Sequence, residues 1–573
     1  MKITAHFTPP QAPKARAQAP RAEQSGDRFQ PGDWKQQLAN YGAKLQARED
    51  LGIQDGNQNA EALAKILGDT SPTSDLKVIA DRHMARAGLL VSFPDGALAE
   101  ANAVSAPPGL SDGVVDLRHL PMVSVDNGEL DPITGKLLNE SKDIDQCDYA
   151  ERLPNGNIRK LVAIADVDCL VAKGSGLDRQ AMHNSSTVYT DDKIFPMIAE
   201  RFSTDFTSLN GGTDRLAMVK EYQVTPEGEV VEPKVYRAYI HNHAKMAYDS
   251  VNEWLTDGPG AKPPQLANPV VAEQIRLQDE AAQRLRGSFY AKGSLDIESK
   301  EVKAEMENGE VVGMKVDEQN RAKDMIKYSM MAANMASMQV LEAAGMPSLR
   351  RIVKRPEKWD RIVELAKSYE YKLPSTPNAK QLNNFLESRK SADPERYEAL
   401  CNKVVRLVGR GEYVVSVPGE PVEGHFCLAV ADYGHTTAPN RRAPDLVNQR
   451  IEKAVAEGKD CPYTPEELEE LALHFTKQEE EIAGVERQVH RSASAKLMED
   501  RIGQSFDAVV SRSGPQGTFV KLDDPPVMGK WKGRPLDEGE EVRVTLAGVN
   551  VEKGWIDFTP AETQQADGFL FKA

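Results

Sequence analysis

The sequence has no long apolar run. None of its segments approaches the ~20 consecutive apolar residues that cross a bilayer, and its N-terminus lacks the apolar core of a secretory signal. Hydrophobic residues make up 40% of the chain and charged residues 28%, as in soluble globular proteins. We therefore expect a cytoplasmic protein with no membrane partner.

Cysteine is also scarce. The five cysteines are odd in number and scattered, and none forms a Cys-x-x-Cys pair. This pattern argues against a disulfide framework or a zinc knuckle, and it fits a reducing cytoplasm.

Common catalytic motifs are missing. The chain contains no P-loop, no His-Glu-x-x-His, no Gly-x-Ser-x-Gly and no dinucleotide fingerprint, and its ten histidines show no metal-ligand spacing. Positive charge is in deficit, since the formal net charge is −16. That balance argues against a nucleic-acid partner for the surface as a whole. Phosphate binding, however, needs only a local basic channel.

The chain is long enough for several domains. At 573 residues it exceeds one ordinary core. We predict an α+β multidomain protein with a disordered arm (1–28), a helical module (29–105), a central α/β domain (106–495) and a C-terminal OB-fold β-barrel (496–573). The helical module is either winged-helix-like, with Ser74 capping a helix that ends at Gly88 and a short strand over 89–93, or a plain bundle.

Hydrophobic periodicity places the main elements of the central domain. An Asn155-Gly156 turn predicts a β-hairpin, and Thr464 begins a capping box before a long amphipathic helix. Strands are expected over 162–167, 216–224 and 234–240, and helices over 177–183, 271–286 and 321–344. The third of these helices is rich in methionine, which at that spacing indicates core packing.

The predicted barrel carries aromatic residues and lysines that suit a single-stranded nucleic acid. Phe519 and Trp531 are candidates for base stacking, and Lys521 lies beside them for phosphate contact. Phe506 and Phe558 are expected to fill the barrel instead.

Carboxylates crowd one short segment. Asp143, Asp145 and Asp148 lie within residues 141–148, Ser-Lys-Asp-Ile-Asp-Gln-Cys-Asp, and Asp126 joins them if the intervening chain loops back. Such density requires separation, protonation or a cation, and oxygen ligands without His or Cys suit Mg²⁺ or Mn²⁺. The alternative is a solvated acidic turn.

Several motifs, in order over about residues 112–455, resemble the ribonuclease II (RNB) family of processive exoribonucleases. Residues 115–126, Val-Asp-Leu-Arg-His-Leu-Pro-Met-Val-Ser-Val-Asp, resemble the segment that delivers the family's first metal-site aspartate. Residues 143–146 resemble its Asp-x-Asp-Asp motif. Residues 425–429, His-Phe-Cys-Leu-Ala, and 433–442, Tyr-Gly-His-Thr-Thr-Ala-Pro-Asn-Arg-Arg, resemble His-Phe-x-Leu-Ala and Tyr-x-His-Phe-Thr-Ser-Pro-Ile-Arg-Arg. The resemblance makes 106–495 an RNB catalytic domain, with no N-terminal cold-shock barrels.

The resemblance implies a metal site. Asp126, Asp143 and Asp145 match positions that hold Mg²⁺ and the attacking water, with Asp131 as the fallback for Asp126 because a long insert follows it. The fourth position, usually aspartate, is Gln146 here. Asp148 is a further candidate ligand if the backbone bulges.

The resemblance also implies residues that contact RNA. Arg441 matches the catalytic arginine, which acts with Asp143 and Asp145, and Arg442 is its neighbour. Tyr189 matches an aromatic residue that packs against RNA near the 3′ end. Ile297 replaces a second aromatic clamp, and Lys327-Tyr328 replaces an acidic pair, which makes Tyr328 a candidate RNA contact.

Together these features predict a monomeric, Mg²⁺-dependent 3′-to-5′ exoribonuclease that degrades single-stranded RNA processively to nucleoside 5′-monophosphates. Gln146 motivates an alternative, an RNA-binding protein of this fold with weakened catalysis. A further alternative is a phosphodiesterase that acts mainly on DNA or cuts internally.

Overall fold

The structure is a computed structural model, and it describes residues 65–561 except 132, 135, 296 and 298–300. The predicted disordered arm over 1–28 and the first part of the helical module lie outside the described residues. Within the described ranges, no helix is long and apolar enough to cross a membrane.

A six-stranded sheet forms the centre of the molecule. Its strands are β1 (Val115–Asp116), β2 (Met122–Asp126), β5 (Gln146–Arg152), β6 (Ile158–Ala165), β9 (Asp214–Val224) and β10 (Val230–Ala247). They lie in the order β1-β10-β2-β5-β6-β9, and β9 also pairs with β10, so the sheet curls back on itself. β1 and β2 run parallel to β10, and the other pairs are antiparallel.

The β5–β6 hairpin forms at the predicted Asn155-Gly156 turn. The Leu153 N–H donates to the Asn157 carbonyl at 2.8 Å, and Gly156 adopts a φ of 85°, which favours glycine. Both faces of the hairpin are covered, so β6 reads as a nearly continuous apolar run rather than an alternating one.

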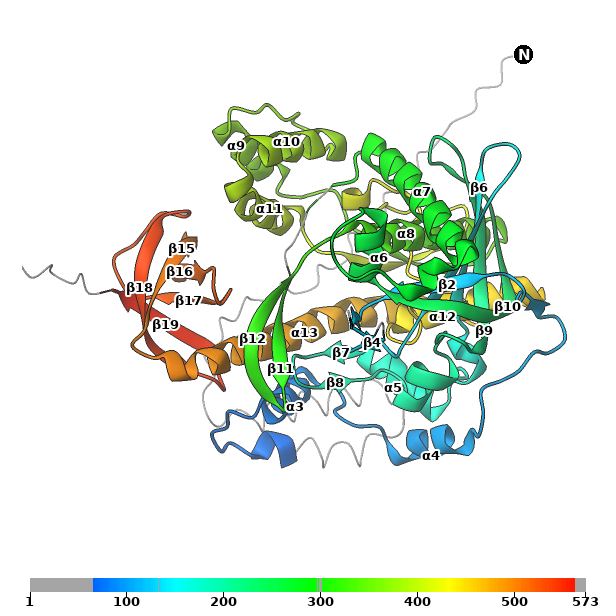
Figure 1. The fold of residues 1–573 in the computed structure, drawn as a ribbon, viewed down its shortest axis with the longest axis horizontal. Helices are drawn as coiled ribbons and strands as arrows, with labels where there is room; N and C mark the ends of the chain where they lie inside the picture. The colour runs from blue at the N-terminus through cyan, green and yellow to red at the C-terminus, as the bar shows by residue number, and fades with distance from the viewer. Residues whose placement is uncertain (1–64, 132, 135, 296, 298–300, 562–573) are drawn as a thin grey trace, which may run out of the picture.

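Helices cover both faces of the sheet (Figure 1). On one face lie α6 (Tyr248–Leu255), α7 (Pro269–Lys292) and α8 (Arg321–Ala343), which share a core with β2, β6 and β9. The methionines of α8 pack in the core as predicted: Met325 and Met331 are buried in this core, and Met338 is buried in the core on the other face. On the other face lie α5 (Gly176–Asn184), α12 (Ala443–Glu457) and the start of α13 (Pro465–Met498).

The N-terminal region differs in part from the prediction. The helix α3 (Leu76–Ala87) is capped at its N-terminus by Asp75 rather than Ser74, since the Asp75 carboxylate accepts the Lys77 N–H at 2.8 Å. Its C-terminal cap is Gly88, as expected. The strand predicted over 89–93 was wrong. The side chain of Asn184 instead binds the N–H and the carbonyl of Leu90, at 2.9 and 3.0 Å, and α4 (Asp95–Ala103) follows.

The long helix α13 leads from the central body to a small closed barrel. Its start is the predicted capping box, in which Thr464 and Glu467 bind each other's backbone N–H groups. In Figure 1 the barrel lies at the far end of α13 from the central sheet. Its strands, in the order β15-β16-β17-β19-β18, are β15 (Ser505–Gly514), β16 (Gly517–Leu522), β17 (Met528–Trp531), β19 (Trp555–Pro560) and β18 (Glu541–Asn550).

The barrel core settles the roles of two aromatic residues. Phe558 is fully buried, as predicted. The stacking role predicted for Trp531 was wrong, because its side chain is 6% exposed and its Nε1–H donates to the Arg534 carbonyl at 2.7 Å inside the fold.

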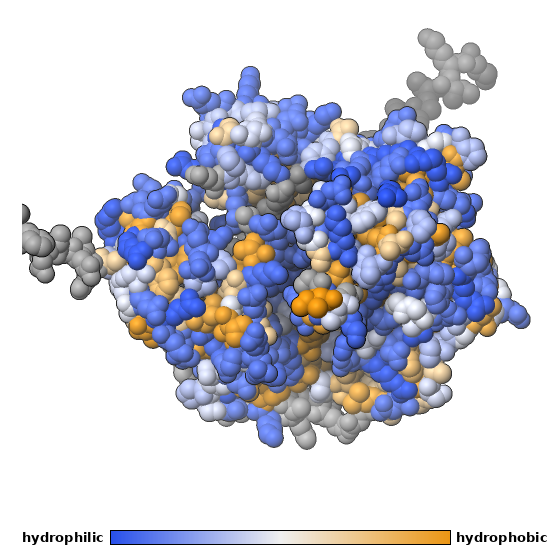
Figure 2. Space-filling model, in the orientation of Figure 1, coloured by the Kyte–Doolittle hydropathy of each residue, from blue (hydrophilic) through white to orange (hydrophobic). Residues whose placement is uncertain are grey.

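The remaining elements are a helical lobe of α9 (Trp359–Ser368), α10 (Ala379–Ala392) and α11 (Pro394–Val408), and the strand pairs β11 (Glu301–Glu307) with β12 (Glu310–Asp317), β13 (Ser348–Ile352) with β14 (Glu412–Ser416), β3 (Glu129–Leu130) with β4 (Leu137–Leu138), and β7 (Val188–Tyr189) with β8 (Ile194–Phe195). Residues of α11, β11 and β7 border a hollow between the barrel and the central body. The space-filling view shows this hollow bordered mainly by hydrophilic residues (Figure 2).

Candidate active site

A cavity of about 2250 Å³ connects the end of the central sheet with the barrel. Its inner part is lined by residues at the end of β2, by residues just before and at the start of β5, by β7 and by the loop before α12. Its outer part is lined by α11, α13, β11 and the strands of the barrel. It is therefore long enough to reach from one domain to the other.

Three of the predicted carboxylates meet in the inner part. Asp126 ends β2, Asp143 and Asp145 precede β5, and all three line the cavity together with Gln146. They come together because β2 and β5 are neighbours in the sheet. The insert after Asp126 leaves as the β3–β4 hairpin and returns, so it does not separate them.

The fallback residue Asp131 lies on that hairpin instead. Its carboxylate accepts the N–H groups of Ile133 and Thr134, at 2.8 and 3.0 Å, and it does not line the cavity. The structure therefore favours Asp126 over Asp131.

Burial and mutual repulsion disfavour the ionised forms of two carboxyl groups in the site. Burial raises the pKa of Asp145 to about 7, while Arg441 opposes the rise and the Asp143 carboxylate adds to it. Burial also raises the pKa of Asp126, with the Asp143 carboxylate adding again. A cation placed among these groups would favour their ionised forms.

Arg441 lies directly beside these acids. Its Nε is 3.5 Å from Oδ2 of Asp145, whose other oxygen accepts the Asn440 N–H at 3.2 Å. The loop that carries Arg441 is fixed from both sides. Asp445 accepts the N–H groups of Thr437 and Ala438 at 2.8 Å each, and the Arg441 carbonyl accepts the Thr187 N–H at 3.0 Å.

Two tyrosines complete the inner cavity. The hydroxyl of Tyr189 donates to Oδ2 of Asp143 at 3.2 Å, and its ring remains 41% exposed. Tyr248, which the sequence analysis missed, lines the cavity next to Asp126. It follows Ala247, the residue of β10 that pairs with Asp126, so its place in the cavity depends on a strand pairing that no motif in the sequence marks.

The donor set fits a hard divalent cation. Within the described residues, no three His, Cys, Asp or Glu side chains are arranged as a ready metal site. Three carboxylates and one amide nevertheless share the cavity, and no histidine among the described residues lines its inner part. Oxygen donors of this kind suit Mg²⁺ or Mn²⁺ rather than zinc.

The structure contradicts a ligand role for Asp148. This residue points into the core from β5, where Lys160 lies 2.9 Å from its Oδ1 and the hydroxyl of Ser329 donates to the same oxygen at 2.9 Å. Both members of the ion pair are almost completely buried. A lysine therefore already neutralises the charge that was expected to help hold a metal ion.

The RNA-binding role predicted for Tyr328 is contradicted as well, while that of Arg442 stays a prediction. Tyr328 is 3% exposed and stacks on Phe289 with ring centroids 5.9 Å apart. Arg442 directly precedes α12, and its Nη2 lies 2.8 Å from the buried Asp445. It is not among the residues that line the cavity. The residue Ile297 is partly buried against the helical lobe.

Phe519 and Lys521 line the outer cavity, where Lys521 lies 3.1 Å from Glu398. The sequence analysis missed Trp555, which is 60% exposed on the same wall, with the Lys553 ammonium 4.7 Å from its ring centroid. It also missed Arg487 and Arg491, although their spacing of four residues on a predicted helix marks a basic face.

Comparison with known families identifies two regions. Residues 115–458 match the RNB domain, and residues 504–561 match the C-terminal S1 domain of RNase II-type exonucleases. The first match spans the carboxylates and Arg441, and the second spans the barrel.

Curated relatives resemble the whole arrangement. Ribonuclease R of Thermotoga maritima is 30% identical over 551 residues, which is 89% of this chain and 74% of that protein. Ribonuclease R of Escherichia coli is 29% identical over 502 residues, 80% of this chain but only 59% of the relative. The chain thus covers less than two thirds of the second relative.

Among solved structures, Mycoplasma genitalium RNase R in complex with ribose-methylated single-stranded RNA has a similar fold. The TM-score is 0.75 at 22% identity, over 85% of this chain and 78% of that one.

Proposed function

The chain belongs to the RNB family, and on this premise we propose that it is a hydrolytic exoribonuclease that degrades single-stranded RNA processively from the 3′ end to nucleoside 5′-monophosphates with Mg²⁺. The observation that carries the proposal is the placement of Arg441 beside Asp145 in the same cavity as Asp126 and Asp143. The 3′-to-5′ direction and the preference for RNA come from the family.

We propose that Asp126, Asp143 and Asp145, with the amide oxygen of Gln146, hold Mg²⁺. When bound, the ion supplies Lewis acidity toward the scissile phosphate and lowers the pKa of water. Arg441 contributes its planar guanidinium, which donates two parallel hydrogen bonds to non-bridging phosphate oxygens and stabilises the charge that grows there during attack. Its fixed loop keeps this group in position before the substrate binds.

Tyr189 is suited to orient the end of the strand. Its hydroxyl is tied to Asp143 while its ring stays accessible in the cavity, so a base or ribose can pack on it without moving the carboxylate. Lys521 and Phe519 on the barrel are suited to phosphate and base contacts farther from the reacting end.

Gln146 supports a second candidate, an RNA-binding protein with weakened catalysis. A neutral amide replaces a carboxylate at this position, and its Nε2–H donates to the Val125 carbonyl at 3.3 Å, which leaves the amide oxygen for the cavity. The retention of three acids beside Arg441 favours the enzyme, because a protein that only binds RNA has no use for clustered carboxylates that repel phosphate.

The test uses a 5′-labelled single-stranded RNA incubated with Mg²⁺ or with EDTA. With Mg²⁺ we expect the full-length strand to be replaced by a short product that keeps the 5′ label, without a ladder of intermediates, while chromatography detects nucleoside 5′-monophosphates. In EDTA we expect an intact strand. Binding without cleavage in Mg²⁺ would support the second candidate. Rapid cleavage of a matching DNA strand, or of a circular RNA, would instead point to a phosphodiesterase acting on DNA or cutting internally.

We also propose that the protein acts as a cytoplasmic monomer. All five cysteines are free, which fits a reducing compartment. Sedimentation of the purified protein at several concentrations tests the oligomeric state.

A further inference from the structure

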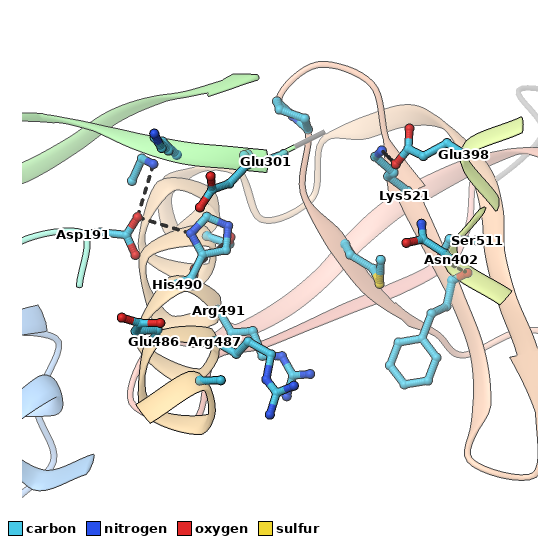
Figure 3. Close-up of a pocket in the computed structure, with 18 of the residues that line it drawn as sticks. Asp191, Glu301, Glu398, Asn402, Glu486, Arg487, His490, Arg491, Ser511 and Lys521 are labelled. Atoms are coloured by element: carbon cyan, nitrogen blue, oxygen red, sulfur yellow. Dashed lines mark hydrogen bonds and ion pairs between the residues drawn. The ribbon is translucent and has the colours of Figure 1, made fainter. Parts of the chain in front are cut away.

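Three arginines face the outer cavity from two elements. Arg487 and Arg491 lie one turn apart on α13, and Arg512 lies on β15 of the barrel. Figure 3 shows Arg487 and Arg491 side by side, both extending from α13 into the space toward the barrel. These three residues are called the arginine cluster below.

Within the described part of the chain, no acidic side chain forms an ion pair with the arginine cluster. Two lysines on the same cavity wall are paired: Lys521 lies 3.1 Å from Glu398, and Lys532 lies 3.5 Å from Asp557. The nearest acid along α13, Glu486, accepts the Tyr189 N–H at 3.0 Å. Three fixed positive charges therefore point into the cavity without compensation.

The cluster repels itself in the absence of an anion. Burial lowers the pKa of Arg491, and the positive charges of Arg487 and Arg512 lower it further. Because a guanidinium remains protonated at neutral pH, this repulsion persists until a negative group enters.

The packing around the cluster holds it in place. A Cβ atom on Gly554 would lie 2.6 Å from Cβ of Arg491, and the φ of Gly554 is +62°, so the turn between β18 and β19 sits directly against α13. On the other side, the Arg512 guanidinium lies 4.3 Å from the ring centroid of Phe519. The three charges are thus carried by a tight seam between helix and barrel rather than by a loose loop.

We propose that the arginine cluster is a binding site for the phosphodiester backbone of the substrate strand, upstream of the 3′ end that reacts at Asp145 and Arg441. Guanidinium groups match phosphate oxygens, and Phe519 beside Arg512 offers a ring on which a base can stack. This inference rests on the proposed function, because it places a second contact on the same RNA strand.

The two contacts are in different parts of one cavity, so the cluster acts only on strands long enough to reach it. A short oligonucleotide that fills the inner cavity is held by the active site alone. The cluster should therefore add affinity to long strands and nothing to the shortest ones.

The experiment compares two variants that remove the same charge. One is R487Q/R491Q/R512Q. The control is K358Q/R361Q/K367Q, whose positions are exposed on or beside α9 and do not line the cavity. Binding of oligoadenylates of increasing length is measured in EDTA over a range of salt concentrations, and kcat/KM is measured with Mg²⁺ on the same lengths.

For the longest strands we expect the cluster variant to bind with a salt dependence whose slope is smaller by about 2, since each phosphate contact on a single strand contributes about 0.7. If wild type and the variant bind equally at 1 M salt, this difference in slope corresponds to about 50-fold weaker binding by the variant at 0.15 M. For the shortest strands that wild type cleaves, kcat/KM should equal the wild-type value. The control should match wild type at every length.

An unchanged slope and length dependence in the cluster variant would overturn the inference, and so would an equal loss at every length. Either result leaves the proposed function standing if wild type still releases mononucleotides. If wild type releases none, the proposed function itself fails. If the triple variant melts at a lower temperature than wild type, the single variant R487Q replaces it in the same binding and cleavage measurements. Its salt-dependence slope should then be smaller than that of wild type by about 0.7.

Discussion

Oδ2 of Asp145 and Nε of Arg441 lie 3.5 Å apart, although one residue stands just before β5 and the other just before α12. The Asn440 N–H binds the second oxygen of the same carboxylate, so the loop before α12 contacts Asp145 by backbone and side chain at once. A change at either residue therefore alters both a carboxylate and the arginine that would meet the phosphate.

Asp145→Asn should abolish cleavage while RNA binding remains. The substitution keeps the shape of the side chain but removes the charge of a proposed metal ligand. Loss of groups that only orient metal ligands typically costs 10- to 100-fold, so we expect a fall of more than ~100-fold in kcat. The measurement is release of mononucleotides, with gel-shift affinity as the binding readout. Asp131→Asn serves as the control, and full activity in Asp145→Asn would show that the site is misplaced.

Arg441→Lys should lower kcat by about 100-fold or more, because a lysine keeps the positive charge but loses the paired donors that match phosphate oxygens. Single-turnover cleavage at saturating enzyme isolates this effect from binding. Arg410→Lys, at an exposed pair with Glu480, is the matched control. Equal rates for both variants would exclude Arg441 from the reaction.

The Mg²⁺ concentration that half-saturates cleavage should fall as the pH rises from 6 to 8. Asp145 has a pKa of about 7 before metal binds, so below that pH it is mostly protonated and metal must displace the proton. One such proton predicts about tenfold weaker metal affinity at pH 6 than at pH 8. Titrations of cleavage rate against Mg²⁺ at three pH values test this, and a half-saturating concentration independent of pH would contradict it.

Asp148→Asn should destabilise the fold without changing the need for Mg²⁺. It leaves the ammonium of Lys160 buried and unpaired, which costs about 3–5 kcal/mol of unfolding free energy. Denaturant unfolding measures that loss, and the Mg²⁺ titration of cleavage should stay at the wild-type value. The double variant Lys160→Met/Asp148→Leu should recover most of the stability, since an apolar pair leaves no buried charge. A higher half-saturating Mg²⁺ concentration in Asp148→Asn than in wild type would instead support the ligand role rejected above.

The sequence predicted what local pattern determines and missed what neighbouring strands determine. The hairpin at Gly156, the capping box at Thr464 and the burial of Phe558 follow from residue types at short spacing. The motif order also placed Asp126 correctly in the cavity with Asp143, despite the insert between them.

Asp148 could not be placed in that way. Its closeness to Asp145 in the sequence suggested a shared site, but its partner Lys160 comes from the next strand of the sheet. The RNA contact predicted for Tyr328 was wrong for a related reason. Periodicity predicts a helix but does not show that Phe289 of another helix covers this side of it. The arginine cluster needs two elements, α13 and β15, whose contact no local pattern encodes.

The helix α13 contacts Tyr189 through Glu486 and, five residues farther on, packs through Arg491 against the turn of the barrel at Gly554. A continuous helix is stiff over this length, unlike a linker whose end-to-end distance fluctuates. The helix therefore holds the barrel at a fixed distance from the active site. For a strand bound as proposed, the number of nucleotides between the active site and the barrel is then fixed by the protein, and an added turn of helix would increase that number.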